Sequence, residues 1–172
     1  MNRAIFLDRD GIINEHDPQK DYYIVSWDKF KFIPGTKEAI AKLSRTDYLI
    51  FIITNQQAIG KGLMSIEDLN KIHENMLNEI RSVGGRIDRI YYCPHLENQC
   101  NCRKPSPMLI DIAVKEFNLN LGESWVIGDS EMDIIMGRAR GCRTILIGKN
   151  NFCQADYSAR DLNEAVSGII LR

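Results

Sequence analysis

The sequence has no long apolar run, no excess of one charge and no internal repeat. None of its hydrophobic stretches approaches the roughly 20 residues of a transmembrane helix, and no secretory signal pattern is visible at its start. The 22 Lys and Arg residues against 23 Asp and Glu give a net charge of −1. Because nucleic-acid-binding surfaces are strongly basic, this charge predicts no nucleic-acid partner. The missing apolar run and signal pattern predict a cytoplasmic protein with no membrane partner.

Linkers and low-complexity segments are missing as well. The 172 residues, 44% hydrophobic and 26% charged, are typical of one globular domain spanning residues 1–172. Five cysteines are present, and Cys93, Cys100 and Cys102 fall within ten residues of one another. In a reducing compartment such a cluster more often binds metal than forms disulfides. Cys142 is expected in the core, and Cys153 has no assigned role.

Short apolar runs alternate with longer amphipathic segments along the chain. Strands are predicted over residues 4–7, 48–54, 89–93, 125–127 and 143–147. Helices are predicted over residues 34–44, 65–83, 107–117 and 130–140, with a last helix capped by Asp161. This alternation predicts an α/β fold, a three-layer Rossmann-like parallel sheet with helices on both faces. No large cap domain fits between these elements, so residues 14–31 are the candidate flap over a site.

Two carboxylates, Asp8 and Asp10, follow the first apolar run and precede Gly11. Residues i and i+2 of a strand point to the same side, so both can serve one site. One carboxylate could attack a phosphoryl group, the other could transfer a proton, and Mg²⁺ would suit these oxygen ligands. The alternative is an ordinary polar turn.

Polar residues also follow two other apolar runs. Thr54, Asn55 and Gln56 follow the second run, and Asp129 follows the fourth. Ligands of parallel α/β sheets bind beyond the carboxyl ends of the strands, so these side chains are expected to meet. Each has a simpler interpretation: Thr54 and Asn55 could cap a turn, and Asp129 could cap the next helix. Their coincidence with the first motif favours a functional site.

The third run leads into a cluster of potential metal ligands. Cys93, His95, Cys100 and Cys102 supply three thiolates and one imidazole within residues 93–102. Cys₃His is a closed ligand set for structural Zn²⁺, so a zinc-pinned loop is predicted there. A buried Cys93, a free thiol pair or a Cys100–Cys102 disulfide are the alternatives.

The chain carries four motifs in order: FLDRDG at residues 6–11, ITNQ at 53–56, YYCPH at 91–95 and CNCRKPSPML at 100–109. Together they resemble the haloacid dehalogenase-like (HAD) phosphatases, in particular the group of heptose-bisphosphate and histidinol-phosphate phosphatases. The departures are Ile12, where the family usually has Thr, and Gln57 with Ala58 in place of Ser-Gly.

The resemblance implies chemical roles. Asp8 would attack phosphorus, while Asp10 would protonate the leaving group and then activate water. Mg²⁺ would be held by Asp8, the Asp10 carbonyl and Asp129. Lys104 would supply positive charge beside the phosphate, although Arg103 and Lys104 could also be an exposed basic pair. The expected catalytic residues are Asp8, Asp10, Thr54 and Lys104.

The resemblance also implies substrate contacts. Thr54 and the N–H of Asn55 would bind phosphoryl oxygens, and the planar guanidinium of Arg103 suits a second phosphate. The remaining expected substrate contacts are Arg9, Gln56 and Lys61. Two further residues are expected to act as supports: Asp133 by orienting its neighbours, and His73 as a structural residue of its helix.

The function implied is a Mg²⁺-dependent phosphatase that releases the C7 phosphate of D-glycero-D-manno-heptose 1,7-bisphosphate, in the synthesis of a bacterial surface glycan such as lipopolysaccharide. Histidinol phosphate or another small sugar phosphate is the alternative substrate, but Arg103 and Lys61 favour a doubly anionic one. A nucleic-acid 3′-phosphatase and a zinc-stabilised binding module are the other hypotheses. We expect a monomer whose partner is a small phosphorylated sugar.

Overall fold

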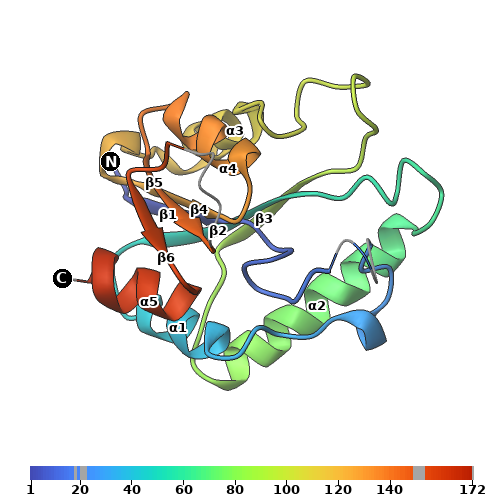
Figure 1. The fold of residues 1–172 in the computed structure, drawn as a ribbon, viewed down its shortest axis with the longest axis horizontal. Helices are drawn as coiled ribbons and strands as arrows, with labels where there is room; N and C mark the ends of the chain where they lie inside the picture. Colours follow the sequence, from blue (N-terminus) through green and yellow to red (C-terminus); the bar gives the residue numbers. More distant parts are fainter. Residues whose placement is uncertain (18, 20–22, 149–153, 172) are drawn as a thin grey trace.

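The computed structural model describes residues 1–17, 19, 23–148 and 154–171 of the chain. Within these residues, six parallel strands form one sheet with the order β3-β2-β1-β4-β5-β6 (Figure 1). The strands are β1 (Ala4–Leu7), β2 (Leu49–Asn55), β3 (Arg89–Cys93), β4 (Trp125–Gly128), β5 (Arg143–Ile147) and β6 (Tyr157–Ala159). The strand order changes direction at β1, between β2 and β4, and ligands of such sheets bind in the crevice at this point.

Helices cover both faces of the sheet, as predicted. In the described part of the chain they are α1 (Thr36–Leu43), α2 (Ile66–Ser82), α3 (Met108–Phe117), α4 (Glu131–Arg138) and α5 (Leu162–Ala165). Two 3-10 turns, η1 (Trp27–Lys29) and η2 (Leu121–Glu123), and one π-helical turn, η3 (Val166–Ile170), accompany them. Helices α1, α2 and α5 pack on one face, and α3 and α4 pack on the other (Figure 1). The three-layer α/β prediction is therefore confirmed.

The central strand β1 shows how the apolar sequence produces these layers. Ile5 and Leu7 belong to the core under α1, α2 and α5, whereas Ala4 and Phe6 belong to the core under α3 and α4. Side chains alternate between the faces of a strand, and all four are fully buried. Burying a side chain of the size of Phe contributes about 1.5–3 kcal/mol, so these residues hold β1 rigidly beneath its polar carboxyl end.

Most element ends agree with the predictions, and the differences have local causes. Helix α1 starts two residues late because Gly35 adopts a φ of 83°, outside the helical region. Helix α4 ends at Arg138, and Gly141 follows with a φ of 71°. Strand β6 was not predicted. It has three residues at the sheet edge, and Tyr157 is exposed, so it lacks the apolar run that marks a buried strand.

The segment that follows the Asp8–Asp10 turn is anchored at its base. The Glu15 N–H donates to the Lys31 carbonyl at 2.8 Å, and the Ile33 N–H donates to the Ile13 carbonyl at 3.0 Å. Within the segment that these hydrogen bonds enclose, the Trp27 ring stacks on the Phe30 ring with centroids 5.0 Å apart. The candidate flap therefore emerges from a paired base. No helix in the described residues is long and apolar enough to cross a bilayer.

Candidate active site

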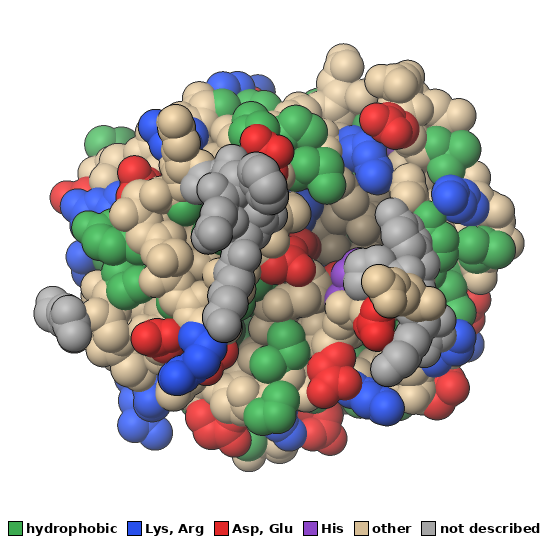
Figure 2. Space-filling model, in the orientation of Figure 1, with side chains coloured by type: hydrophobic (Ala, Val, Ile, Leu, Met, Phe, Trp, Pro, Cys, Tyr) green, Lys and Arg blue, Asp and Glu red, His purple; other side chains and the backbone are tan. Residues whose placement is uncertain are grey.

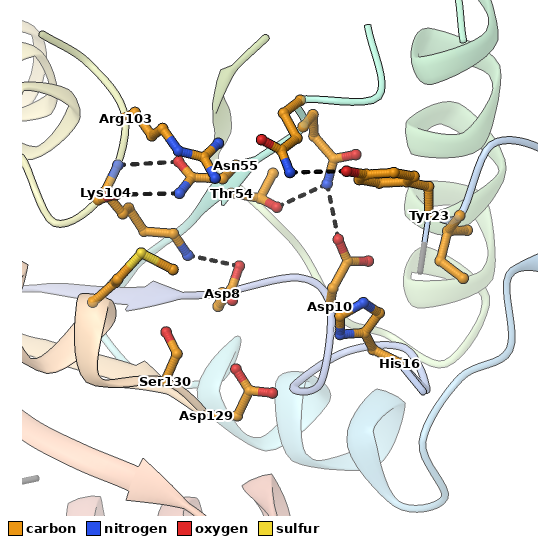
Figure 3. A pocket seen from close by; sticks show the side chains of 14 residues that line it. Asp8, Asp10, His16, Tyr23, Thr54, Asn55, Arg103, Lys104, Asp129 and Ser130 are labelled. Carbon is orange, nitrogen blue, oxygen red and sulfur yellow. Dashed lines mark hydrogen bonds and ion pairs between the residues drawn. The ribbon is translucent and has the colours of Figure 1, made fainter. Parts of the chain in front are cut away.

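A cavity of about 300 Å³ opens beyond the carboxyl ends of β1, β2 and β4. Figure 2 shows this face hollowed near its centre, with acidic side chains visible there. Its lining combines the predicted motifs with flap residues (Figure 3): Asp8, Asp10, His16, Tyr23, Ile24, Thr54, Asn55, Gln56, Gln57, Arg103, Lys104, Asp129, Ser130 and Met132. Most predicted site residues thus meet at one place, although the loops that carry them are far apart in sequence.

Asp8 lies directly after β1, and its carboxylate meets the ammonium of Lys104. The Asp8 N–H donates to the Ile127 carbonyl at 3.0 Å, which ties this residue to β4. Lys104 Nζ lies 2.9 Å from Asp8 Oδ1 (Figure 3). Burial raises the pKa of Asp8 to about 8 against the opposing charge of Lys104, and the nearby Asp133, Asp10 and Asp129 raise it further. An added cation would favour the ionised form that a nucleophile requires.

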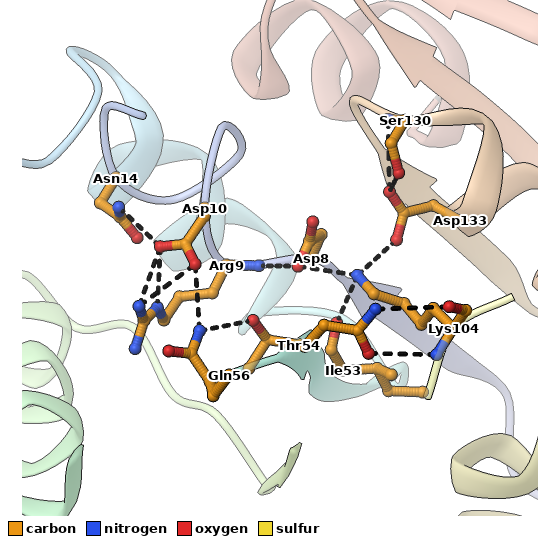
Figure 4. A network of polar contacts seen from close by, with 11 residues as sticks. Asp8, Arg9, Asp10, Asn14, Ile53, Thr54, Gln56, Lys104, Ser130 and Asp133 are labelled. Carbon is orange, nitrogen blue, oxygen red and sulfur yellow. Dashed lines mark hydrogen bonds and ion pairs between the residues drawn. The ribbon is translucent and has the colours of Figure 1, made fainter. Parts of the chain in front are cut away.

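Lys104 is held from several directions despite being almost fully buried. Its Nζ donates to Asp133 Oδ1 at 2.6 Å and to the Ile53 carbonyl at 3.1 Å (Figure 4). Burial disfavours its charge, but Asp133 and Asp8 outweigh burial and raise the pKa of Lys104 above its ordinary value. The Asn55 side chain accepts from the Lys104 N–H at 3.0 Å and donates to the Lys104 carbonyl at 3.4 Å. Lys104 is therefore a fixed positive charge.

Three carboxylates form the acidic end of the cavity. One oxygen each from Asp8, Asp129 and Asp133 lies within 4.8 Å of the others. An ideal Cβ on Gly11 would lie 1.9 Å from Asp129 Oδ2, so only glycine allows this carboxylate to approach the Asp8–Asp10 turn. Burial and the charge of Asp133 raise the pKa of Asp129 to about 6. Crowded oxygen ligands whose charges repel one another suit a divalent cation such as Mg²⁺.

Asp133 has a different environment from Asp129 within this group. It is buried, and it accepts from Lys104 Nζ and, at 2.5 Å, from the Ser130 hydroxyl at the start of α4. The Ser130 N–H also donates to its carboxylate at 3.3 Å. Asp133 thus contacts Lys104 and caps the helix.

Asp10 points away from Lys104 and accepts hydrogen bonds from three side chains (Figure 4). Arg9 Nη2 donates at 2.9 Å, Asn14 Nδ2 at 3.0 Å, and Gln56 Nε2 at 3.0 Å. Burial disfavours the charged carboxylate, but the Arg9 charge and these hydrogen bonds outweigh burial and lower the pKa of Asp10. Gln56 also donates to the Thr54 hydroxyl at 2.9 Å, which links Asp10 to the β2 end.

Two expected substrate contacts do not line the cavity. The Arg9 side chain is fully buried beneath Asp10, so it is placed to support Asp10 instead of touching substrate. Lys61 Nζ lies 5.3 Å from the centroid of the Tyr23 ring, on the flap side of the cavity. Gln57 donates to the Tyr23 hydroxyl at 2.8 Å. The turn after β2 therefore holds Tyr23 in the cavity wall.

Arg103 lies on the opposite side of the cavity from Tyr23 (Figure 3). Its Nη1 atom is buried and has no hydrogen-bond partner among the described residues. A buried guanidinium nitrogen without an acceptor carries a desolvation cost, which an anionic ligand group would relieve. Arg103 thus lines the cavity with a hydrogen-bond donor that a charged ligand group could use.

The predicted zinc ligands come together beside the cavity. The Sγ atoms of Cys93 and Cys100 are 3.4 Å apart, and His95 Nδ1 lies 3.4 Å from Cys102 Sγ and 3.7 Å from Cys93 Sγ. Two sulfurs on a tetrahedral zinc, at bonds of about 2.3 Å, are separated by about 3.8 Å, so the four residues fit such an ion. Cys142 is buried in the core as expected, and Cys153 lies outside the described residues.

The motifs did not reveal every cavity residue. His16 and Tyr23 come from the predicted flap, but nothing in their sequence context marked them individually. Met132 and Ser130 enter through the start of α4. Their position relative to Asp129 was a possible signal, because the first turn of a helix after a parallel strand faces the ligand edge.

Comparisons with known proteins give consistent matches. A family profile described as "HAD-hyrolase-like" matches residues 101–167. The D-glycero-beta-D-manno-heptose-1,7-bisphosphate 7-phosphatase of Pasteurella multocida is 35% identical, over 98% of this chain and 99% of that protein. The D-glycero-alpha-D-manno-heptose-1,7-bisphosphate 7-phosphatase of Burkholderia mallei is 36% identical, over 91% and 83%. The crystal structure of D,D-heptose 1,7-bisphosphate phosphatase from B. bronchiseptica, complexed with magnesium and phosphate, superposes with a TM-score of 0.90 at 28% identity, over 98% of both chains.

Proposed function

This chain belongs to the heptose-1,7-bisphosphate 7-phosphatase family of HAD-like hydrolases and is a phosphoric monoester hydrolase, and from this membership we propose that it hydrolyses the C7 phosphate of D-glycero-D-manno-heptose 1,7-bisphosphate through an aspartyl-phosphate intermediate. The observation that carries the proposal is the Asp8 carboxylate in the cavity, 2.9 Å from the buried Lys104 ammonium. A carboxylate nucleophile beside a fixed cation is the arrangement that covalent phosphoryl transfer to an aspartate needs.

Magnesium is the cofactor that suits the acidic end of the cavity. The B. bronchiseptica relative was crystallised with magnesium and phosphate. In this chain the carboxylates of Asp8 and Asp129 and the backbone carbonyl of Asp10 would hold the ion, because Mg²⁺ prefers oxygen ligands. Once bound, it would reduce the repulsion between the Asp8 carboxylate and the substrate phosphate.

The chain's own residues then divide the chemistry into two steps. In the substrate complex the negative charge of the phosphate opposes the charge of Asp10 and favours its protonated form. Asp8 then attacks phosphorus, the bond from phosphorus to the sugar oxygen breaks, and the protonated Asp10 donates its proton to that oxygen. In the second step Asp10 accepts a proton from the water that attacks the phosphorylated Asp8, and phosphate leaves. Lys104 remains protonated throughout, and the Thr54 hydroxyl with the Asn55 N–H binds phosphoryl oxygens.

The substrate class follows from the charge on the wall opposite the flap. The unpartnered Nη1 of Arg103 needs a hydrogen-bond acceptor, and guanidinium groups bind phosphates well. A second phosphate would satisfy this atom. Histidinol phosphate carries an amine instead, which would place a cation near Arg103 and bind less well.

Zinc would have a structural role in this enzyme. Cys93, His95, Cys100 and Cys102 would fill a tetrahedral site with no open position for a substrate. Residues Arg103 and Lys104 follow the last ligand directly, so the ion would stabilise the loop from which both extend into the cavity.

The experiment is phosphate release with Mg²⁺ from both anomers of heptose 1,7-bisphosphate and from histidinol phosphate. We expect the bisphosphate to have at least a tenfold higher kcat/KM, and Asp8→Asn to abolish release. Asp28→Asn, which changes an exposed carboxylate of η1, is the matched control and should retain activity.

Other outcomes would redirect the proposal. A preference for histidinol phosphate would keep the mechanism and overturn the substrate. Faster release from a 3′-phosphorylated oligonucleotide would indicate a nucleic-acid substrate. Turnover that survives Asp8→Asn would overturn the aspartyl-phosphate mechanism itself.

A further inference from the structure

A fully buried arginine lies directly beneath Asp10. Arg9 follows Asp8 in the chain, yet its side chain turns away from the cavity and has no exposed surface. Its Nε and Nη2 atoms donate to Asp10 Oδ1 at 3.1 and 2.9 Å, and Nη2 lies 3.2 Å from Oδ2 (Figure 4). A guanidinium is always charged and only donates hydrogen bonds, so its remaining nitrogen also needs an acceptor.

His73 supplies that acceptor. Its Nε2 atom lies 3.3 Å from Arg9 Nη1. Because arginine cannot accept, Nε2 must carry the lone pair, which assigns a neutral ring with its proton on Nδ1. Burial, followed by the Arg9 charge, lowers the pKa of His73 to about 3, which agrees with a neutral ring.

The His73 ring is buried and packs against its protein neighbours. It is on the buried face of α2 together with Ile72 and Met76. Its ring centroid lies 6.2 Å from that of Tyr92 on β3, with the planes at 62°. Helix α2 and strand β3 therefore fix the far end of a chain of contacts that runs from His73 through Arg9 to Asp10.

From this arrangement we propose that His73 is a positioning residue, which acts through Arg9 to hold the Asp10 carboxylate in the orientation needed for proton transfer. The inference rests on the proposed function, since it concerns the acid and base of that reaction. Arginine has four rotatable side-chain bonds. A buried acceptor at Nη1 favours the orientation of Arg9 in which Nε and Nη2 face the Asp10 carboxylate. Small displacements of a catalytic group cost about 10²-fold in rate.

The test compares His73→Leu, which removes the acceptor, with His73→Gln, which keeps an amide oxygen of similar reach. Leu69→Ala on the same buried face of α2 is the control for lost packing. Each variant is assayed on a sugar phosphate, whose alkoxide leaving group needs a proton, and on acetyl phosphate, whose leaving group does not. Wild type and Asp10→Asn are measured alongside, and folding is checked by thermal unfolding.

We expect His73→Leu to lower kcat/KM for the sugar phosphate about 10- to 100-fold, with less than about a threefold loss for acetyl phosphate. His73→Gln should recover most of the loss, and Leu69→Ala should lower stability without this selectivity. Equal losses on both substrates, no loss on either, or the same pattern in Leu69→Ala would overturn the role of His73.

Failure of the proposed function can be distinguished from failure of the inference about His73. If Asp10→Asn shows no dependence on the leaving group, then Asp10 is not the acid, and the role of His73 falls with it. If heptose bisphosphate is simply a poor substrate for the wild type, the comparison is made with whichever sugar phosphate is hydrolysed best, and the inference about His73 is still decided.

Discussion

At the scale of single residues, the site depends on charges that are buried in pairs. Lys104 lies between Asp8 and Asp133 with almost no exposed surface. Leaving one member of a buried charge pair without its partner is costly, about 3–5 kcal/mol. The same contacts that orient Lys104 toward the cavity therefore make it hard to replace.

Replacing Lys104 with methionine should lower kcat by roughly 10²- to 10³-fold, because the positive charge beside the attacked phosphate is lost. The measurement is steady-state phosphate release, with circular dichroism to show that the variant is folded. Lys115→Met, at an exposed position of α3, should leave kcat unchanged. A folded Lys104→Met enzyme with near wild-type kcat would contradict the assigned role.

His73 should make the folded state sensitive to acid. Burial and the Arg9 charge lower its pKa to about 3 in the folded protein, whereas an unfolded chain titrates near 6.5. Between these values the unfolded state binds a proton at His73 that the folded state does not, so the contribution of His73 to stability decreases as the pH falls below about 6.5 and does not change above it. At pH 5 the loss should be about 2 kcal/mol.

Urea unfolding of the wild type and of His73→Gln, at pH 7.5 and pH 5, measures this loss. The wild type should lose more stability on acidification than the variant, by about the 2 kcal/mol given above. If both proteins lose the same amount, His73 is not the group that binds the extra proton.

At the scale of elements, the loop of residues 93–102 supports two other parts of the site. The Gln56 N–H donates to the Cys93 carbonyl at 2.7 Å, and the Gly60 N–H donates to the Pro94 carbonyl at 3.0 Å. An ideal Cβ on Gly60 would lie 2.8 Å from that carbonyl oxygen. The loop thus packs closely on the turn after β2, from which Gln57 reaches Tyr23.

Removal of zinc should therefore reduce activity, although none of the four predicted zinc ligands lines the cavity. We expect Cys100→Ser to lose bound zinc, measured by mass spectrometry of the metal content, and to lose activity about 10- to 100-fold. Cys142→Ala, which changes a buried cysteine outside the cluster, should retain both. A zinc-free variant with full activity would show that the loop holds its shape without the ion.

At the scale of the whole molecule, repulsion among the buried carboxylates at the acidic end of the cavity opposes folding, and a bound cation should offset it. Burial and mutual repulsion raise the pKa values of Asp8 and Asp129 to about 8 and about 6. A ligand that binds only the folded state stabilises it by mass action, by about 2.7 kcal/mol at 100 times its Kd.

Mg²⁺ should accordingly raise Tm, by roughly 2–4 °C for each kcal/mol in a chain of this size. Asp129→Asn should reduce that increase, while Asp28→Asn should not. The readout is thermal unfolding at increasing Mg²⁺ concentration, and it does not depend on turnover. An Asp129→Asn protein that responds to Mg²⁺ like the wild type would exclude Asp129 as a ligand.

The hydrophobic pattern and the motifs were enough to predict the fold and part of the candidate site from the sequence. The alternation of apolar runs was enough to predict the parallel sheet with two helical layers, because burial on both faces demands such runs. The cysteine and histidine spacing predicted a cluster that the fold does bring together. The capping box at Ser65 and Asp68, where α2 begins, is likewise local, since it depends only on residues three positions apart.

The alternation of strand side chains that was expected for Asp8 and Asp10 is not present in the structure. Both line the cavity, but β1 ends at Leu7, so the alternation of a strand does not place them. Asp8 instead faces Lys104, and Asp10 faces Arg9, Asn14 and Gln56. The chain leaves the strand before Asp8, so the two side chains face different partners although both line the cavity.

What the sequence by itself determined was therefore local or repetitive: the secondary-structure pattern, the metal-ligand spacing and the resemblance carried by its motifs. Tertiary structure alone decided which buried polar groups contact one another. Lys104 reaches Asp8, and His73 reaches Arg9 across 64 positions of the chain, and no periodicity encodes such pairs. They form because the order of the strands brings distant loops to one edge, where each buried charge must find a partner.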